Sequence, residues 1–115
     1  GGTLMTGNEL AAAVQYGAKV RIFVSNNKCY GTIRLHQEKS FPGRIEATTL
    51  VNPDFAKWAE SFGALGLRID KPEDADPALA EALAHDGPVV IDVDASLEHI
   101  SAYTNLTSLK PGAAK

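Results

Sequence analysis

The chain has 115 residues, of which 44% are hydrophobic and 22% charged, a composition typical of one globular domain with a buried core. The net charge is -3 at pH 7 and the basic residues are scattered singly, so the electrostatic footprint of a nucleic-acid-binding protein is missing. The single cysteine, Cys29, excludes an internal disulfide, and no apolar run approaches the roughly 20 residues of a membrane helix. We therefore expect a cytoplasmic domain that binds neither nucleic acid nor a membrane.

The first predicted elements are a helix and an apolar strand. Thr6–Glu9 matches a capping box, which predicts a helix over residues 6–16 that Gly17 ends. A strand is predicted over about 19–25, where Val20–Val24 form an apolar, β-branched run. Such a run is typical of a parallel strand covered on both faces, so we expect Val20–Val24 to be buried.

Two helices are predicted next. Residues 31–39 form a short helix that Phe41-Pro42-Gly43 breaks. Asn52-Pro53 is a helix start, with the asparagine as cap and the proline at the first position. The apolar side chains that follow recur at helical spacing and predict one core-facing side: Phe55, Trp58, Ala59 and Phe62.

The second half continues the alternation of strands and helices. After a stop at Gly63, residues 65–69 are a short strand. Asp76-Pro77 starts a third helix, whose apolar residues are Leu79, Ala82 and Leu83. Val89–Val93 is the clearest buried strand, and 110–115 is expected to be a frayed tail.

This alternation predicts an α/β domain with a mostly parallel sheet and helices on both faces. Ligands of such sheets bind outside the carboxyl ends of the strands. Two loops are expected there: Gly1–Thr3, which leads into the first helix, and Asn26–Gly31, which follows the first strand. By itself, the pair Asn26-Asn27 is equally well interpreted as a turn after a strand, since asparagine tolerates the left-handed conformation.

These loops carry a resemblance to a known family. GGTLMTGNEL (residues 1–10) and SNNKCYGTI (25–33) resemble the C-terminal, pyrophosphate-binding domain of thiamine-diphosphate-dependent enzymes, in the acetolactate synthase and benzoylformate decarboxylase branch. The motif of that family is Gly-Asp-Gly, a spacer, and Asn-Asn; Gly1 matches its last glycine and Asn27 its second asparagine. The resemblance covers residues 1–104, and we assign 105–115 to a C-terminal tail.

The resemblance implies thiamine diphosphate and Mg²⁺ as cofactors. The implied metal ligands are the side chain of Asn27 and the main-chain carbonyl of Cys29, whose thiol has no expected role as a nucleophile. Glycine lets the backbone approach phosphates, and an asparagine oxygen is a suitable ligand for Mg²⁺. The implied cofactor-binding residues are Gly1, Gly2, Asn27, Cys29, Tyr30, Gly31 and Thr32, and the implied substrate-pocket residues are Thr32, Ile33 and His36.

The chain also departs from the family pattern. The aspartate of the motif would precede Gly1, and the family's glutamate that activates the cofactor lies on another domain. The resemblance therefore implies one part of a longer lyase or transferase acting on 2-oxo acids, completed by other domains and a second subunit as a homo-oligomer. We expect the chain alone to be inactive, with no catalytic residue of its own, and to expose a sheet edge where the strand before Gly1 is missing.

Two other functions stay open. A non-catalytic binding or assembly domain could keep this fold with a degenerate metal site. An α/β module for a different phosphorylated ligand is the other alternative, although neither Gly-x-Gly-x-x-Gly nor a P-loop pattern occurs.

Overall fold

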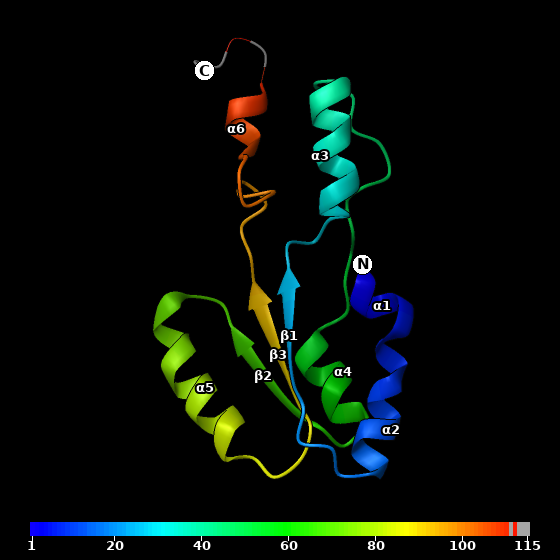
Figure 1. Cartoon of the computed structure of the whole chain (residues 1–115), viewed down its shortest axis with the longest axis vertical. Helices are drawn as coiled ribbons and strands as arrows, with labels where there is room; N and C mark the ends of the chain where they lie inside the picture. The colour runs from blue at the N-terminus through cyan, green and yellow to red at the C-terminus, as the bar shows by residue number, and fades with distance from the viewer. Residues whose placement is uncertain (111, 113–115) are drawn as a thin grey trace. The chain divides into compact units, whose positions relative to one another are not determined.

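The computed structural model describes residues 1–110 and 112, and it contains a three-stranded sheet with helices packed on it (Figure 1). The chain divides into two compact units. The sheet unit comprises Gly1–Asn26 and Asn52–Asp94, and the second unit comprises Asn27–Val51 and Ala95–Lys115. Within the described residues, no helix has the length and apolar character needed to cross a membrane.

The sheet is parallel throughout. Its strands are β1 (Arg21–Asn26), β2 (Leu65–Ile69) and β3 (Val89–Asp94), in the order β1-β3-β2. Both outer strands start level with Val89 of β3. The predicted α/β class with a mostly parallel sheet is confirmed, and the predicted strand over 65–69 matches β2 residue for residue.

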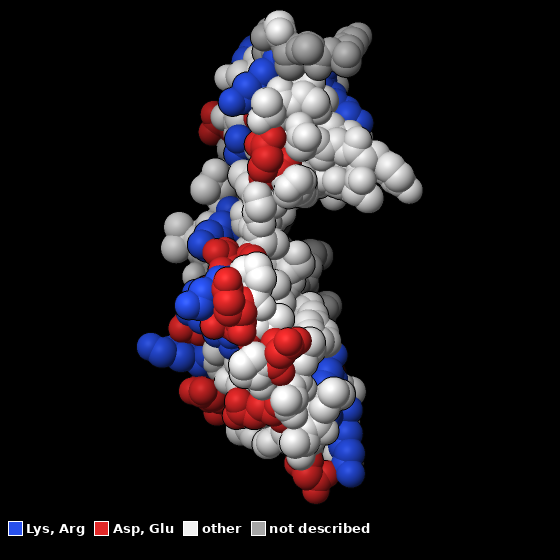
Figure 2. Space-filling model, turned by 90° about the vertical axis from the view of Figure 1, so that its left-hand side faces the viewer, with Lys and Arg blue, Asp and Glu red and all other residues white. Residues whose placement is uncertain are grey.

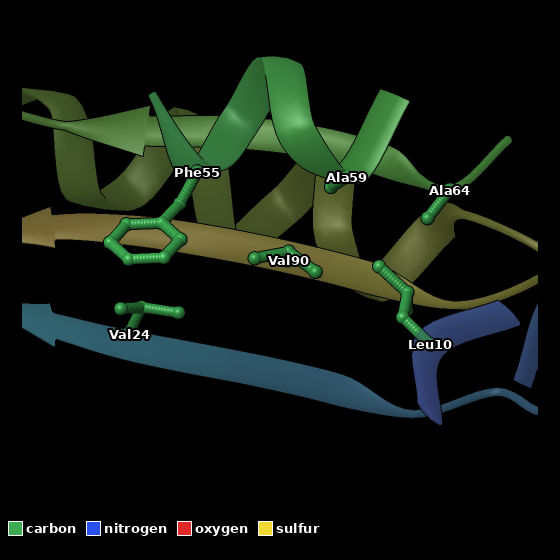
Figure 3. Close-up of a cluster of buried hydrophobic side chains, with 6 residues drawn as sticks. All are labelled: Leu10, Val24, Phe55, Ala59, Ala64 and Val90. Atoms are coloured by element: carbon green, nitrogen blue, oxygen red, sulfur yellow. The ribbon is translucent and has the colours of Figure 1, made fainter. Parts of the chain in front are cut away.

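Helices cover both faces of the sheet, as predicted. Helices α2 (Leu10–Gln15) and α4 (Phe55–Ser61) lie on one face, and α5 (Ala75–Ala84) lies on the other (Figure 1). Successive residues of a strand point to opposite faces, so the core has two parts. Figure 3 shows the first part, which contains Leu10, Val24, Phe55, Ala59, Ala64 and Val90; the second contains Ala82, Val89 and Ile91.

The aromatic side chains of the α4 region pack on the first core, as predicted. The ring of Trp58 lies edge-on to the rings of Phe55 and Phe62, with centroid distances of 6.1 and 5.1 Å. Phe55 is 1% exposed, and Trp58 and Phe62 are partly buried against the cluster. These residues therefore form the core side of α4.

The N-terminal helix begins earlier than predicted. Helix α1 (Gly2–Thr6) continues through the 3-10 turn η1 (Gly7–Glu9) into α2. The side chain of Thr6 makes no capping hydrogen bond, so the capping-box prediction is wrong. A Cβ on Gly7 would lie 2.7 Å from the Trp58 ring, so glycine at this position permits close packing on α4.

The predicted helix ends at Gly17 and Gly63 are confirmed. Gly17 has φ +63°, and its N–H donates to the Val14 carbonyl while the Ala18 N–H donates to the Ala13 carbonyl. This pattern is a Schellman motif. Gly63, with φ +89°, ends α4 in the same way, because glycine adopts a positive φ without steric cost.

The predicted burial of the first strand is wrong at most of its residues. Val24 is 6% exposed, but Phe23 is 55% exposed and Val20 and Ile22 are also exposed. The cause is position, since β1 is at an edge of the sheet and pairs with β3 alone among the described strands. The expectation that a strand before Gly1 would pair with this edge stays a prediction.

Helix α4 begins two residues later than Asn52-Pro53 predicted. Its N-cap is Asp54, whose carboxylate accepts a hydrogen bond from the Lys57 backbone N–H at 3.1 Å. That hydrogen bond lowers the pKa of Asp54 below its usual value. The side chain of Asn52 instead hydrogen-bonds Asn26.

Helix α5 also differs from its prediction. It follows the 3-10 turn η2 (Pro72–Asp74), so it starts before Asp76-Pro77 and accommodates the proline within its first turn. Its buried residues are Ala78 and Ala82, whereas Leu79 and Leu83 are exposed. Small side chains thus let α5 approach the sheet closely.

The second unit contains helix α3 (Gly31–Ser40), which confirms the helix predicted over 31–39. The chain turns after Phe41, the C-cap, and Gly43 has φ +75°. The predicted break at Phe41-Pro42-Gly43 is therefore confirmed.

A further helix of this unit, α6 (Leu106–Leu109), was not predicted. The side chain of Asn105 caps it by accepting from the Ser108 N–H at 2.9 Å. Hydrogen bonds from Thr107 lower the pKa of Glu98. Of the tail predicted over 110–115, residues 111 and 113–115 lie outside the described residues, and the boundary between residues 104 and 105 stays a prediction.

Candidate functional site

The predicted glycines Gly1 and Gly2 lie at a helix start in the sheet unit. Gly1 is the N-cap of α1, and its carbonyl accepts from the Leu4 N–H at 3.1 Å. The N–H groups of a first helical turn have no carbonyl partner inside the helix, and they attract anions. A Cβ on Gly2 would meet no atom within 4 Å, so the fold itself does not require glycine there. Because Gly2 has no side chain, a phosphate group could approach the backbone N–H groups at the start of α1 closely.

The predicted ligand Asn27 organises a tight turn in the second unit. Its side-chain Oδ1 accepts a hydrogen bond from the Cys29 N–H at 3.2 Å. Lys28, between them, has φ +56°, a left-handed conformation that is uncommon outside glycine. A side-chain carbonyl oxygen has two lone pairs, so this bond leaves acceptor capacity on Oδ1 for a cation.

Backbone pairing sets the direction of the Cys29 carbonyl. Cys29 and Thr49 form an antiparallel bridge, flanked by hydrogen bonds from Tyr30 N–H to Thr48 O at 2.8 Å and from Leu50 N–H to Lys28 O at 2.9 Å. At such a non-hydrogen-bonded position, the N–H and C=O of Cys29 point away from the partner segment. The N–H meets Asn27 Oδ1, so the Cys29 carbonyl is directed to the same side as that oxygen.

The thiol of Cys29 has a separate, structural environment. Cys29 is 5% exposed and forms no disulfide. Its side chain is therefore buried while its main chain lines the turn. This arrangement fits the prediction that only the carbonyl of Cys29 serves as a ligand.

The next predicted residues begin α3. Tyr30 is the N-cap of this helix, and Gly31 and Thr32 occupy its first turn. A Cβ on Gly31 would lie 2.9 Å from Nδ2 of Asn27. Glycine at this position therefore leaves room for the Asn27 amide, and the structure brings the two residues together.

The predicted substrate-pocket residues share one side of α3. Thr32, Ile33 and His36 are all exposed, and their spacing places them on adjoining parts of the helix surface. Gln37, by contrast, turns toward the rest of its own unit, where it hydrogen-bonds Glu46 and Thr48. The three predicted residues thus form a surface that other parts of a protein, or a substrate, can contact.

The two predicted ligand atoms, Asn27 Oδ1 and the Cys29 carbonyl oxygen, are uncharged. Among the described residues, no three His, Cys, Asp or Glu side chains cluster in a way that could hold a metal ion. Figure 2, which views the side of the sheet unit covered by α5, shows acidic and basic side chains intermixed. Neutral, hard oxygen ligands of this kind fit Mg²⁺ when an anionic ligand such as a diphosphate neutralises its charge.

Sequence reasoning missed a group of polar residues in the sheet unit. Asn26 and Asp92 are buried, and Asn26 Nδ2 donates to Asp92 Oδ1 at 3.2 Å. Asn52 Nδ2 donates to Asn26 Oδ1 at 2.8 Å. The sequence signal that could have pointed to this group was Asp92, an aspartate within the apolar run Val89–Val93.

The chain matches a model of the family described as "Thiamine pyrophosphate enzyme, C-terminal TPP binding domain" over residues 1–93. It is 40% identical over 90 residues to the mitochondrial acetolactate synthase catalytic subunit of Saccharomyces cerevisiae, covering 78% of this chain and 13% of the relative. It is 38% identical over 93 residues to acetolactate synthase of Bacillus subtilis, covering 81% and 16%.

A third relative is the acetolactate synthase large subunit of Haemophilus influenzae, which is 38% identical over 104 residues, covering 87% of this chain and 18% of the relative. The chain thus spans between 13% and 18% of the length of these three relatives. The chain belongs to the thiamine pyrophosphate enzyme family, and its residues 1–93 correspond to the C-terminal TPP-binding domain of that family.

Proposed function

We propose that this chain is the cofactor-binding domain of a longer enzyme that acts on 2-oxo acids, and that it binds thiamine diphosphate together with Mg²⁺. The turn at Asn27 carries the proposal, because it directs Asn27 Oδ1 and the Cys29 carbonyl to the same side. Two neutral oxygens held by backbone pairing are suitable ligands for a hard cation. The similarity to three acetolactate synthases supports this assignment.

In this proposal, the chain's own residues bind and orient the cofactor. In the second unit, the α3 start at Gly31 and Thr32 offers backbone N–H groups to the diphosphate. The resemblance to the family assigns Gly1 and Gly2 of the sheet unit to cofactor binding as well. Asn27 and Cys29 hold the metal ion through oxygen atoms. When bound, thiamine diphosphate supplies the carbanion chemistry that breaks a bond at the 2-oxo carbon of the substrate.

Other parts of the longer protein complete the site in this proposal. Proton transfer to and from the cofactor is assigned to another domain and a second subunit, since the residues predicted here only bind and position. The exposed side chains Thr32, Ile33 and His36 are proposed to contact the substrate. The choice between carboligation and decarboxylation then depends on residues outside this chain.

The proposal is tested in the longer protein, with pyruvate as substrate and carbon dioxide release as the readout. Asn27→Ala should lower activity at limiting Mg²⁺ by roughly 10- to 100-fold, the usual effect of disturbing a metal site. Asn105→Ala is the matched control, since it removes an asparagine that caps α6 and should leave activity unchanged. Equal activity of Asn27→Ala and wild type would overturn the proposed function.

A second variant separates cofactor binding from folding. Gly2→Ala adds a methyl group where no atom of the chain lies within 4 Å, so it should fold like wild type. It should nevertheless weaken thiamine diphosphate binding, because the methyl group obstructs approach to the α1 backbone. Unchanged affinity in calorimetry would remove Gly2 from the proposed site.

A further inference from the structure

The segment that follows α3 runs back along this helix inside the second unit (Figure 1). The side-chain amide of Gln37 joins the helix to this returning segment. Its Nε2 donates to the Glu46 carbonyl at 2.9 Å, and its Oε1 accepts from the Thr48 hydroxyl at 3.3 Å. One amide therefore bonds the returning segment on both sides of Ala47.

Ala47, between these two bonds, has an uncommon backbone conformation. Its φ is +56°, and Lys28 is the other non-glycine residue with a positive φ in the described part of the chain. A residue with a Cβ adopts this conformation at a steric cost, so surrounding contacts must hold it. The two bonds from Gln37 are contacts of this kind, because they fix the residue before Ala47 and the residue after it.

Thr48 connects this turn to a proposed metal ligand. Its side chain is bonded to Gln37, and its main-chain carbonyl accepts from the Tyr30 N–H at 2.8 Å. The next residue, Thr49, forms the antiparallel bridge with Cys29. The position of the Thr48 backbone therefore helps to set the direction of the Cys29 carbonyl.

These contacts form a closed circuit within the second unit. Tyr30 is the N-cap of α3, and Gln37 lies further along the same helix. Thr48 bonds Tyr30 with its main chain and Gln37 with its side chain, so it ties the returning segment to two separate points of the helix. Thr48 is 2% exposed, so water does not compete freely for its hydroxyl. The circuit therefore restrains the backbone next to Cys29.

We propose that Gln37 and Thr48 are positioning residues for Mg²⁺, because they hold the segment that pairs with Cys29. The proposal rests on the function proposed above. Gln37 fixes the turn at Ala47, and Thr48 fixes the backbone that carries the Cys29 carbonyl. Both residues act through this backbone and not by contact with the metal ion.

The main test compares two substitutions of Thr48 in the longer protein. Thr48→Val keeps the size of the buried side chain and removes the hydroxyl, whereas Thr48→Ser keeps the hydroxyl and removes a methyl group. Mg²⁺ is titrated calorimetrically at saturating thiamine diphosphate. Thr48→Val should raise the apparent Kd for Mg²⁺ by roughly 10-fold, as loss of the partners that orient a ligand usually does. Thr48→Ser should bind Mg²⁺ like wild type.

Melting midpoints of the same two variants separate positioning from stability. Thr48→Ser removes a buried methyl group, so it should lower the midpoint while the Kd for Mg²⁺ stays unchanged. A Kd that followed the melting midpoint across the two variants would mean a merely structural role and would overturn the proposal.

A substitution on the helix tests the other end of the circuit. Gln37→Met removes both hydrogen bonds at similar side-chain size and should weaken Mg²⁺ binding at least as much as Thr48→Val. The double variant Gln37→Met/Thr48→Val should bind no more weakly than Gln37→Met, because the bond between the two side chains is already lost in the single variant.

A further readout needs no cofactor. In the metal-free protein, Thr48→Val and Gln37→Met should speed hydrogen exchange of the Tyr30 amide, which donates to the Thr48 carbonyl. The matched control is Asn105→Ala, which removes another amide side chain of the second unit together with the cap of α6. It should change neither the Kd for Mg²⁺ nor the exchange of the Tyr30 amide.

The two readouts distinguish failure of this proposal from failure of the proposed function. If wild-type protein binds no thiamine diphosphate with Mg²⁺, the proposed function fails, and exchange of the Tyr30 amide alone decides whether Gln37 and Thr48 hold the segment. If wild type binds Mg²⁺ and both Thr48→Val and Gln37→Met bind it equally well, the positioning role is overturned, whether or not exchange is faster.

Discussion

Strands β1 and β3 lie side by side in one parallel sheet, and both coincide with apolar, β-branched runs. Their burial nevertheless differs. In β3, Val89, Val90 and Ile91 are completely buried, whereas in β1 Ile22 and Phe23 are exposed. β3 has a strand on each side and helices on both faces, while β1 has one neighbour in the described chain. Place in the sheet decides burial here, because the residue types are alike.

Besides its backbone pairing with β3, β1 is attached to the fold through a polar side chain. The guanidinium of Arg21 donates to the carbonyls of Ala82, His85 and Gly87, at 2.9, 2.6 and 3.0 Å. Two of these carbonyls belong to the end of α5, where a cation also favours the helix dipole. β3 is therefore buried by apolar packing on both faces, whereas β1 adds this three-way contact and Val24 to its backbone pairing with β3.

The largest effect is expected in β3. Ile91→Ala removes a fully buried side chain from the core beneath α5, and such truncations cost about 2–5 kcal/mol. Denaturant unfolding of the chain measures this loss. A cost below about 1 kcal/mol would mean that β3 is not the packed centre of the sheet.

A smaller effect is expected at the polar attachment of β1. Arg21→Ala should lower the free energy of unfolding by about 2 kcal/mol, since hydrogen bonds from a charged donor contribute about 1.5–3 kcal/mol each and water replaces part of the loss. Arg21→Lys keeps the charge, but the single ammonium group of lysine lacks the forked donors with which the guanidinium bonds three carbonyls. It should recover less than half of the stability, and full recovery would show that charge alone matters.

The smallest effect is expected on the exposed side of β1. Phe23→Lys changes a side chain that is 55% exposed, so its effect should stay within about 0.5 kcal/mol, as for most surface substitutions. Val24→Lys is the matched control on the next residue, which is buried, and it should abolish cooperative unfolding. If both variants unfolded alike, the two sides of β1 would not differ as the structure shows.

Several elements could be predicted because their signals are local. The glycines at 17 and 63 mark helix ends by their backbone freedom, and the apolar run of β3 is continuous. The start of α4 could not be predicted in the same way. Asn52 is a good capping residue in isolation, but its amide is used by Asn26, a residue far away in sequence.

In the candidate site, too, local features could be predicted from the sequence, whereas features that depend on distant residues could not. The residues alone allowed a turn at Asn26-Asn27, and the resemblance implied that Asn27 is a metal ligand. The structure adds the bridge that directs the Cys29 carbonyl. The hydrogen bonds among Asn26, Asn52 and Asp92 could not be predicted, because they join three separate segments, although an aspartate in an apolar strand was a signal for a polar group there. The exposure of β1 was missed for a related reason, since burial depends on neighbouring strands that no local pattern describes.

The most direct test of the proposed function is a titration of the isotope-labelled chain with Mg²⁺ and thiamine diphosphate, followed by its amide resonances. Binding should be weak, because the charged aspartate of the family motif would lie before Gly1. The signals of residues 1–6 and 27–32 should move first. Asn27→Ala should abolish the response, and Cys29→Ser should leave it nearly unchanged, because only the main chain of Cys29 is used. Loss of binding in Cys29→Ser would contradict the assignment. Resonance shifts centred on residues outside these two loops, for example on His85 and His99, would contradict it as well.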